Sequence, residues 1–163
     1  MKKDEQVITL DIYTDGSSKK IGSTLFGGWA FIVIQDNKEI YRAANSEQGA
    51  TNQRMELMAI LKALDYARSI RRPHERVIIY SDSAYAINCY KQQWYITWVS
   101  NGWRNSNNKD VANQDLWIKI IPYFDIFWYN FEKVEGHAGD YWNEECDKEA
   151  QQEAENLKIK WRG

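Results

Sequence analysis

Four acidic residues stand where strands and helices are expected to start or end, and together they could bind metal ions. Asp15 and Asp82 each close a stretch rich in β-branched and aromatic residues, while Glu56 and Asp147 lie near the start of expected helices. Carboxylate oxygens are the ligands that Mg²⁺ prefers. Two such ions about 3.5–4 Å apart can stabilise the attacking and leaving oxygens of a phosphoryl displacement. The pattern is therefore compatible with a two-metal nuclease site.

The same acids also have an ordinary explanation. Asp15 could shape a turn through its own side chain, and Glu56 could complement the dipole of its helix. Because the chain contains 23 acids, position alone does not separate these explanations.

The elements expected around these acids would bring them together. Strands are expected at residues 7–15, 28–35, 38–45, 75–82 and 126–134, and helices at 52–69, 83–100, 115–124 and 142–160. Asp36-Asn37 is typical of a hairpin turn, and a helical crossover favours parallel pairing of strand 75–82 with strand 7–15. The predicted fold is mixed α/β, with a five-stranded sheet whose first three strands are antiparallel and helices on both faces. In such a sheet Asp15 and Asp82 would approach each other.

Length favours a single domain of residues 1–163, with an ordered core of about 7–158. Without a disulfide framework or a signal-like apolar N-terminus, we expect a cytoplasmic protein. The net charge of −2 argues against a protein that coats nucleic acid by bulk electrostatics. Cys89 and Cys146 fit no metal-ligand or disulfide pattern, so we expect buried, inert thiols. No apolar run reaches the length of a membrane span, and we expect no membrane partner.

Several short motifs occur in the order and spacing of one enzyme family. These are "YTDGS" at 13–17, "TNQRMEL" at 51–57, "SDS" at 81–83 and "GHAGDYWNEECDKEA" at 136–150. Together they resemble type 1 ribonuclease H. The segment "QWYITWVSNGW" at 93–103 is similar to the part of this family that forms a substrate-binding protrusion, here about residues 92–113.

This resemblance implies a ribonuclease H-like fold and hydrolysis of the RNA strand of an RNA–DNA hybrid, leaving 5′-phosphate and 3′-hydroxyl ends. It implies two Mg²⁺ ions, with Mn²⁺ as a substitute. The metal ligands of the family fall on Asp15, Glu56, Asp82 and Asp147, of which Asp15 and Asp147 carry the bridging and second-ion coordination. Glu56 also lies near the RNA 2′-hydroxyl in this family. His137 matches a mobile-loop histidine that assists the leaving group, although a histidine between glycines is often only a surface residue.

The resemblance also implies contacts with the hybrid. Minor-groove contacts fall on Gly16, Ser17, Asn52 and Gln53, DNA-phosphate contacts on Thr51 and Asn113, and a DNA-channel contact on Trp98. Each set has a simpler alternative: Asn52 and Gln53 could be plain polar residues of a helix start, Thr51 could be the helix N-cap, and Trp94 and Trp98, four residues apart, could pack in the core.

Three departures from the family pattern concern the substrate. Residues 18–28, expected to form a loop, lack the usual Asn-Pro-Gly character. The segment 91–113 has Lys91, Arg104 and Lys109 against Asp110, a net charge of only +2, where many members are lysine-rich. Gly49 stands where some members place an arginine, and Lys19 and Lys20 could either compensate or be solvated.

We therefore expect a monomeric, divalent-metal-dependent endoribonuclease that acts on RNA–DNA hybrids. The alternatives are a transposase-type nuclease of the same wider fold, an inactive hybrid-binding module and a structural α/β protein with incidental surface acids.

Overall fold

The computed structural model describes residues 9–70, 76–125, 128–133 and 141–162. In chain order its elements are β1 (Thr9–Ile21), β2 (Thr24–Gln35), β3 (Lys38–Gln48), α1 (Asn52–Ile70), β4 (Arg76–Ser81), α2 (Ala84–Lys91), α3 (Trp94–Ser100), α4 (Gln114–Ile120), the 3-10 helix η1 (Ile121–Asp125), β5 (Trp128–Lys133) and α5 (Tyr141–Arg162). This succession confirms the predicted mixed α/β class.

One five-stranded sheet runs through the molecule in the order β3-β2-β1-β4-β5. The pairs β1–β2 and β2–β3 are antiparallel, whereas β1–β4 and β4–β5 are parallel. The turn at Asp36-Asn37 joins β2 to β3 with both residues at positive φ, a conformation that Asp and Asn tolerate better than most residues. The predicted antiparallel start of the sheet and its parallel continuation are both confirmed.

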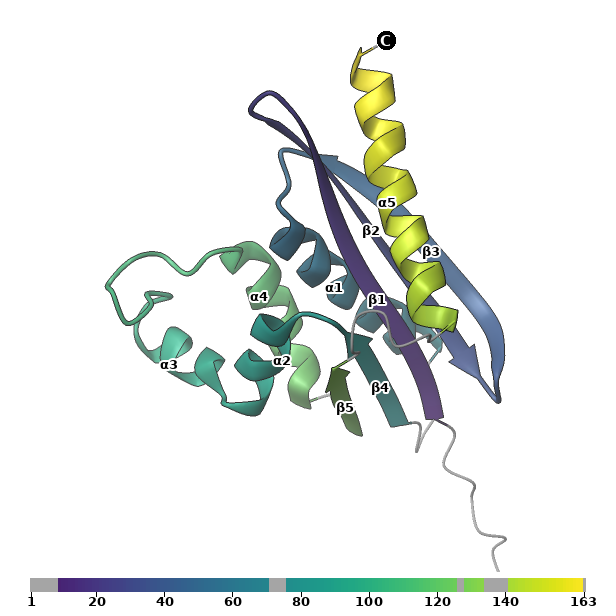
Figure 1. Ribbon diagram of the computed structural model, residues 1–163. Coiled ribbons are helices and arrows are strands. Elements are labelled where there is room, and N and C mark those ends of the chain that lie inside the picture. Colours follow the sequence, from purple (N-terminus) through teal and green to yellow (C-terminus); the bar gives the residue numbers. More distant parts are fainter. Residues whose placement is uncertain (1–8, 71–75, 126–127, 134–140, 163) are drawn as a thin grey trace, which may run out of the picture.

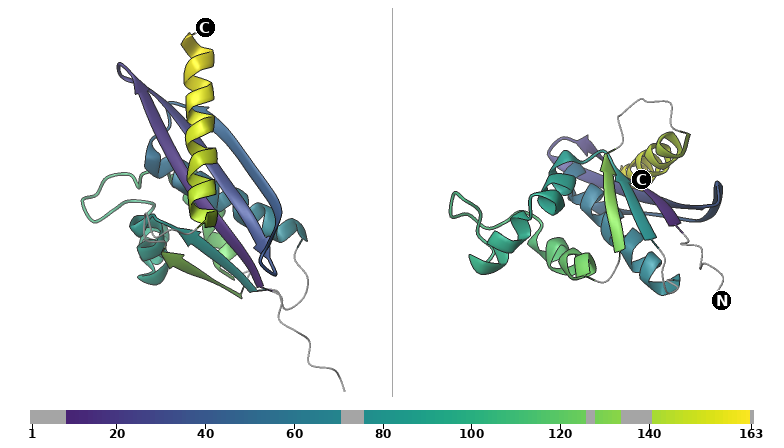
Figure 2. Two further views of the ribbon diagram at one scale, coloured as in Figure 1. Left: turned by 45° about the vertical axis from the view of Figure 1, so that its right-hand side comes forward. Right: turned by 90° about the horizontal axis from the view of Figure 1, so that it is seen from below.

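Helices cover the two faces of the sheet unequally (Figures 1 and 2). Alternate residues of β2 point to opposite sides, so that Ala30, Ile32 and Ile34 pack under α5. Their neighbours Trp29, Phe31 and Val33 belong to the larger core shared with α1, α2 and α4. The period-2 pattern of β2 therefore sorts its side chains between two cores. None of the helices in the described ranges is long and apolar enough to cross a membrane.

The segment expected to be a loop at 18–28 is instead a long hairpin. β1 continues to Ile21 and pairs with β2 from Thr24, around a two-residue turn in which Gly22 has a φ of 59°. Lys19 and Lys20 pair with Phe26 and Leu25 and so lie in the strand itself. The prediction of a loop was wrong because the segment contains no proline and its β-forming residues complete the ladder.

The helix expected at 83–100 is divided in two. Gln93 adopts a left-handed conformation with a φ of 57°, which ends α2 and starts α3 in a new direction. The helix expected at 115–124 ends at Ile120 and continues as the 3-10 turn η1, which contains Pro122. α3 and the loop that follows it extend away from the sheet (Figure 1), at the place predicted for the protrusion.

An ion cluster on the outer side of β3 attaches α5 to the sheet. Arg42 donates to Glu149 at 2.9 Å and to Glu39, and it lies 3.7 Å from Glu145. Because Glu145 and Glu149 belong to α5, this one guanidinium joins the edge strand to the helix. The cluster lies on the face of the sheet opposite to α1.

Gly28 sets the distance between β2 and α5. A Cβ atom at this position would lie 2.1 Å from the carbonyl oxygen of Ala150 and 2.6 Å from the nitrogen of Ala154. Both atoms are backbone, so a side chain at Gly28 would have to displace the helix. The glycine is required here by the close approach of two backbones.

This contact predicts a large stability loss for Gly28→Ala. We expect a decrease in the free energy of unfolding of about 3 kcal/mol, because the added methyl group meets rigid backbone. Gly22→Ala is the matched control, since its Cβ would meet nothing within 4 Å, and the positive φ alone should cost about 1 kcal/mol. Urea unfolding of the two variants measures both losses. Equal losses would contradict the role assigned to Gly28.

Candidate active site

The parallel pairing of β1 with β4 brings Asp15 and Asp82 together. Tyr13 and Tyr80 are partners in the ladder, and each acid lies two residues beyond its tyrosine. The rings of these tyrosines stack with centroids 4.5 Å apart, which reinforces the register. Two carboxylates from segments far apart in sequence thus meet where the two strands diverge.

Glu56 joins this pair from the first turns of α1. Ligand oxygens of Asp15, Glu56 and Asp82 all lie within 4.8 Å of one another. The neighbours of Glu56 in the chain, Met55 and Leu57, are fully buried in the core. The ordinary explanation of Glu56 as a solvated helix-end charge is therefore not what the structure shows.

Gly16 allows α1 to come this close to β1. A Cβ atom on Gly16 would lie 2.3 Å from the main-chain nitrogen of Glu56 and 2.4 Å from the carbonyl carbon of Met55. The main-chain N–H of Gly16 also donates to Asp15 Oδ1 at 2.8 Å and so fixes that carboxylate. The glycine that follows Asp15 thus positions two of the three acids at once.

Asp147 lies near Asp15 on the first turns of α5, and its carboxylate contributes to the raised pKa of Asp15. Its Oδ2 accepts a hydrogen bond from Gln151 Nε2 at 2.8 Å, one helical turn further on. The preceding residue, Cys146, is fully buried and its thiol donates to the carbonyl oxygen of Ala30 at 3.2 Å. This contact ties the start of α5 to β2. The fourth predicted acid therefore belongs to the same neighbourhood, although it is not among the three mutually close carboxylates.

Burial and repulsion between carboxylates make Asp15 and Glu56 unusually weak acids. Burial first, and then the charge of Asp82, raise the pKa of Asp15 to about 8, against the opposing hydrogen bond from Gly16. Burial and Asp82 likewise raise the pKa of Glu56 to about 7, opposed by a hydrogen bond from Ser83. Ser83 caps α2, and its Oγ accepts from the N–H of Ala86 at 3.1 Å. The fold concentrates negative charge that only a cation or protons can balance.

This donor set fits divalent metal ions. All of its ligand atoms are carboxylate oxygens, they come from separate elements, and Asp15 is only 6% exposed. Such hard oxygen ligands suit Mg²⁺ and related ions, and a bound cation would reverse the repulsion that raises the pKa values.

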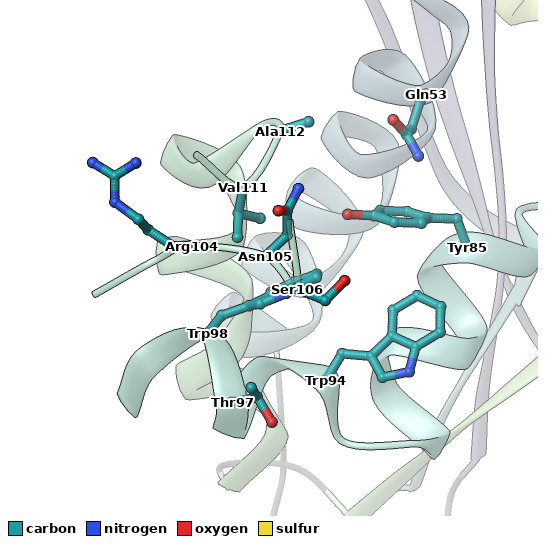
Figure 3. Close-up of a pocket in the computed structure, with 10 residues that line it drawn as sticks. All are labelled: Gln53, Tyr85, Trp94, Thr97, Trp98, Arg104, Asn105, Ser106, Val111 and Ala112. Atoms are coloured by element: carbon teal, nitrogen blue, oxygen red, sulfur yellow. The ribbon is translucent and has the colours of Figure 1, made fainter. Parts of the chain in front are cut away.

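The residues predicted to contact substrate surround α1 and the loop after α3. Thr51 is the N-cap of α1, since its Oγ1 accepts from the N–H of Arg54 at 3.1 Å. Asn52 is exposed, and Gln53 is half-buried at the rim of a pocket of about 500 Å³ (Figure 3). Ser17 is half-buried on β1. The N-cap alternative for Thr51 is therefore correct as local structure and leaves room for a second role.

Trp98 is a core residue that also reaches this pocket. It is only 7% exposed and its ring contacts those of Tyr85, Trp103 and Trp117. In Figure 3 Trp98 and Trp94 lie on the same side of the pocket, with Tyr85 and Gln53 at its upper end. The core-packing alternative is therefore also present in the structure.

Two further observations complete the set. His137 and its flanking glycines lie outside the described residues.

Arg54 was not predicted to have a role, yet it donates to Glu47, Asp115 and Asn113. Arg54 belongs to the motif "TNQRMEL", but its contacts with Asn113 and Asp115 span 59 and 61 residues of sequence, so no local pattern predicts them.

Comparison with known proteins places this arrangement in a family. The family profile described as RNase H matches residues 7–155. The chain is 44% identical to the Ribonuclease H of Syntrophomonas wolfei, over 90% of this chain and 96% of the relative. It is 38% identical to the Ribonuclease H of Chlorobaculum parvum, over 86% of this chain and 91% of the relative. A crystal structure described as a type 1 RNase H with the type 2 active-site motif superposes with a TM-score of 0.77 and 23% identity, covering 94% of this chain and 75% of that chain, and supports the fold.

The raised pKa values predict that the metal-free protein loses stability as the pH rises. Between about pH 4, where an unfolded Asp titrates, and about pH 8 the folded state binds more protons than the unfolded state, so the free energy of unfolding falls. In Asp15→Asn the free energy of unfolding should fall less over this pH range than in wild type, by on the order of 3 kcal/mol. Urea unfolding at pH 5, 7 and 9 with a chelator measures it.

Added Mg²⁺ provides the control for this experiment. Because the ion binds the deprotonated carboxylates, it should restore wild-type stability at pH 8 and have little effect on Asp15→Asn. A pH slope that is the same in both proteins would show that Asp15 is not the source.

Proposed function

This chain belongs to the ribonuclease H family, and we propose that it hydrolyses the RNA strand of RNA–DNA hybrids at the carboxylate cluster of Asp15, Glu56, Asp82 and Asp147. The products would carry 5′-phosphate and 3′-hydroxyl ends. The observation that carries this proposal is the convergence of three acids from three elements within 4.8 Å, in a chain 44% identical to a Ribonuclease H. Family membership also argues against the transposase-type and purely structural alternatives.

The four carboxylates would hold two divalent ions, Mg²⁺ or Mn²⁺. Such ions orient an attacking water and stabilise the charge that develops on the leaving oxygen. Asp15, the most buried acid, would contribute to both ion positions, and Asp147 would complete one of them from α5. Asp82 and Glu56 would supply the remaining ligands. The hydrogen bonds from Gly16 to Asp15 and from Gln151 to Asp147 orient two of these side chains before any ion binds.

Recognition of the RNA strand would depend on its 2′-hydroxyl groups. A 2′-hydroxyl both donates and accepts hydrogen bonds, and it lies in the shallow minor groove of the hybrid. We propose that Glu56, the backbone at Gly16 and the side chains of Ser17, Asn52 and Gln53 contact this groove. These residues come from β1 and from the start of α1, which Gly16 brings into contact.

The DNA strand would lie toward the protrusion. Thr51 and Asn113 are proposed to contact a DNA phosphate, and Trp98 to border the path of the DNA with its exposed edge. The pocket between Trp98, Trp94 and Gln53 supports this path, because aromatic faces can pack on sugars and bases.

His137 is proposed to assist departure of the leaving 3′-oxygen. An imidazole exchanges protons near neutral pH and can therefore supply a proton to that oxygen. We further propose that the protein acts as a cytoplasmic monomer, with its buried thiols Cys89 and Cys146 reduced.

Asp82→Asn tests the catalytic assignment. We expect kcat/KM for a labelled RNA–DNA hybrid in Mg²⁺ to fall by at least about 10³-fold, because the amide replaces a charged ligand of the site. Wild type should cleave neither single-stranded RNA nor RNA and DNA duplexes. Asp36→Asn, in the distant β2–β3 turn, is the control and should cleave as wild type does.

Each alternative outcome has a definite meaning. Cleavage by Asp82→Asn at the wild-type rate would remove Asp82 from the site. Hybrid binding by wild type without turnover in either Mg²⁺ or Mn²⁺ would indicate an inactive binding module.

Because the protrusion carries little positive charge, we expect hybrid binding to depend only weakly on salt concentration. The segment 91–113, which contains the protrusion, has a net charge of only +2, and Arg104 lies 3.6 Å from Asp110. Few phosphates are then neutralised on binding, so affinity should be weak and should fall slowly as salt increases. Asn107→Lys, at an exposed loop position, should steepen the slope of log K against log salt by about 0.9, whereas Asn107→Gln should not. A wild-type slope as steep as that of a lysine-rich relative would contradict this prediction.

A further inference from the structure

Arg54 connects three separate segments beside the proposed DNA-phosphate contacts. Its Nε donates to Glu47 Oε2 at 2.6 Å, at the end of β3. Nη1 and Nη2 donate to the two oxygens of Asp115 at 3.0 and 2.8 Å, a bidentate pair at the start of α4. Nη1 also donates to Asn113 Oδ1 at 3.4 Å. The main-chain N–H of the same residue donates to Thr51 Oγ1. Arg54 therefore touches both residues proposed to bind the DNA phosphate.

Asn113 does not use its side chain as an N-cap residue normally does. It stands at the N-cap of α4 with a φ of 59°, and its side chain makes no capping hydrogen bond. Its main-chain carbonyl accepts from the N–H groups of Leu116 and Trp117 at 3.0 and 3.1 Å. An asparagine in this place usually caps the helix with its amide oxygen. Here that oxygen faces Arg54 instead.

The chemistry of the guanidinium decides which way the amide points. Arginine has only donors, so the atom of Asn113 that faces Arg54 must be the oxygen. The amide nitrogen is then directed away from Arg54 and its two N–H bonds remain as donors. An asparagine without this neighbour would have no fixed choice between donor and acceptor.

Arg54 itself is a poor candidate for a phosphate ligand. Two carboxylates, Glu47 and Asp115, already balance its charge, and the group as a whole is formally −1. Its hydrogen bond and charge hold the pKa of Asp115 below the usual range, as expected for a firmly paired carboxylate. The side chain is 23% exposed. These features suit a residue that holds others in place.

We propose that Arg54 is a positioning residue for the DNA strand, which fixes the amide of Asn113 so that its N–H₂ group, together with the hydroxyl of Thr51, recognises a phosphate by hydrogen bonds. The proposal rests on the hybrid specificity and on the DNA-phosphate contacts proposed above. It implies that both direct donors to the phosphate are uncharged, which agrees with glycine at position 49 and with the weakly basic protrusion. Recognition would then depend on the orientation of donors.

A double-mutant cycle in hybrid cleavage tests the proposal. Arg54→Gln and Asn113→Ala should each raise KM about tenfold and leave kcat nearly unchanged, since a hydrogen bond to a charged group is lost. The double variant should show about the same tenfold increase, because both changes remove one interaction. Arg42→Gln is the matched control, an arginine that also pairs with several carboxylates but lies on the opposite face. It should lower the melting temperature comparably and leave KM unchanged.

Single methylphosphonate linkages along the DNA strand give a second readout. A methylphosphonate at one position of the DNA strand should weaken hybrid binding by wild type about tenfold. The same substitution should not change the affinity of Arg54→Gln or Asn113→Ala, because neither variant makes the contact with that phosphate. If Arg54→Gln does not fold, Asp115→Asn, which removes the bidentate partner, takes its place in the cycle.

The outcomes separate this inference from the proposed function. A wild type that cleaves no hybrid would overturn both. If wild type cleaves the hybrid but the KM increases of the two single variants multiply in the double variant, the role of Arg54 is overturned and the function stands. The same conclusion holds if methylphosphonates weaken binding to wild type and to Arg54→Gln equally.

Discussion

The rest of this structure depends on one constraint: carboxylates that repel one another must be held close together. Asp15, Glu56 and Asp82 would separate if they were free to do so, since burial raises the cost of the charges on Asp15 and Glu56, and Asp82 repels both. Two backbone contacts prevent this separation: the parallel β1–β4 register and the close approach of α1 to β1 at Gly16. Both are maintained by the apolar core beneath, so the hydrophobic effect supplies the work that holds like charges together.

Glycine and arginine perform complementary tasks around the site. Gly16 and Gly28 remove side chains where backbones must touch, and these contacts place α1 and α5 on opposite faces of the sheet. Arg42 and Arg54 instead fill the polar margins, each gathering carboxylates from more than one element. The first kind of contact fixes distance and the second fixes orientation. A site that must hold several oxygens within a few ångströms requires both.

Features with a local cause were predictable from sequence. The Asp36-Asn37 turn, the helix at 52–69 and the proximity of Asp15 to Asp82 all follow from residue type and spacing. The hairpin at 18–28 was not predictable, since its strands are stabilised by pairing with each other. The break at Gln93 was missed because glutamine seldom adopts a left-handed conformation. The Arg54 cluster joins residues some 60 positions apart in the chain, and only the folded arrangement of β3, α1 and α4 reveals it.

The position of Asp147 on the last helix has a consequence for the time at which activity appears. Asp15, Glu56 and Asp82 can assemble once β1, α1 and β4 have formed, but α5 adds the fourth acid only when its small residues dock on β2 at Gly28. Docking depends on contacts distant in sequence, and such contacts form slowly because a long loop must first close. During synthesis the three-acid arrangement would therefore precede the complete site. Until α5 docks, the site would lack its fourth carboxylate.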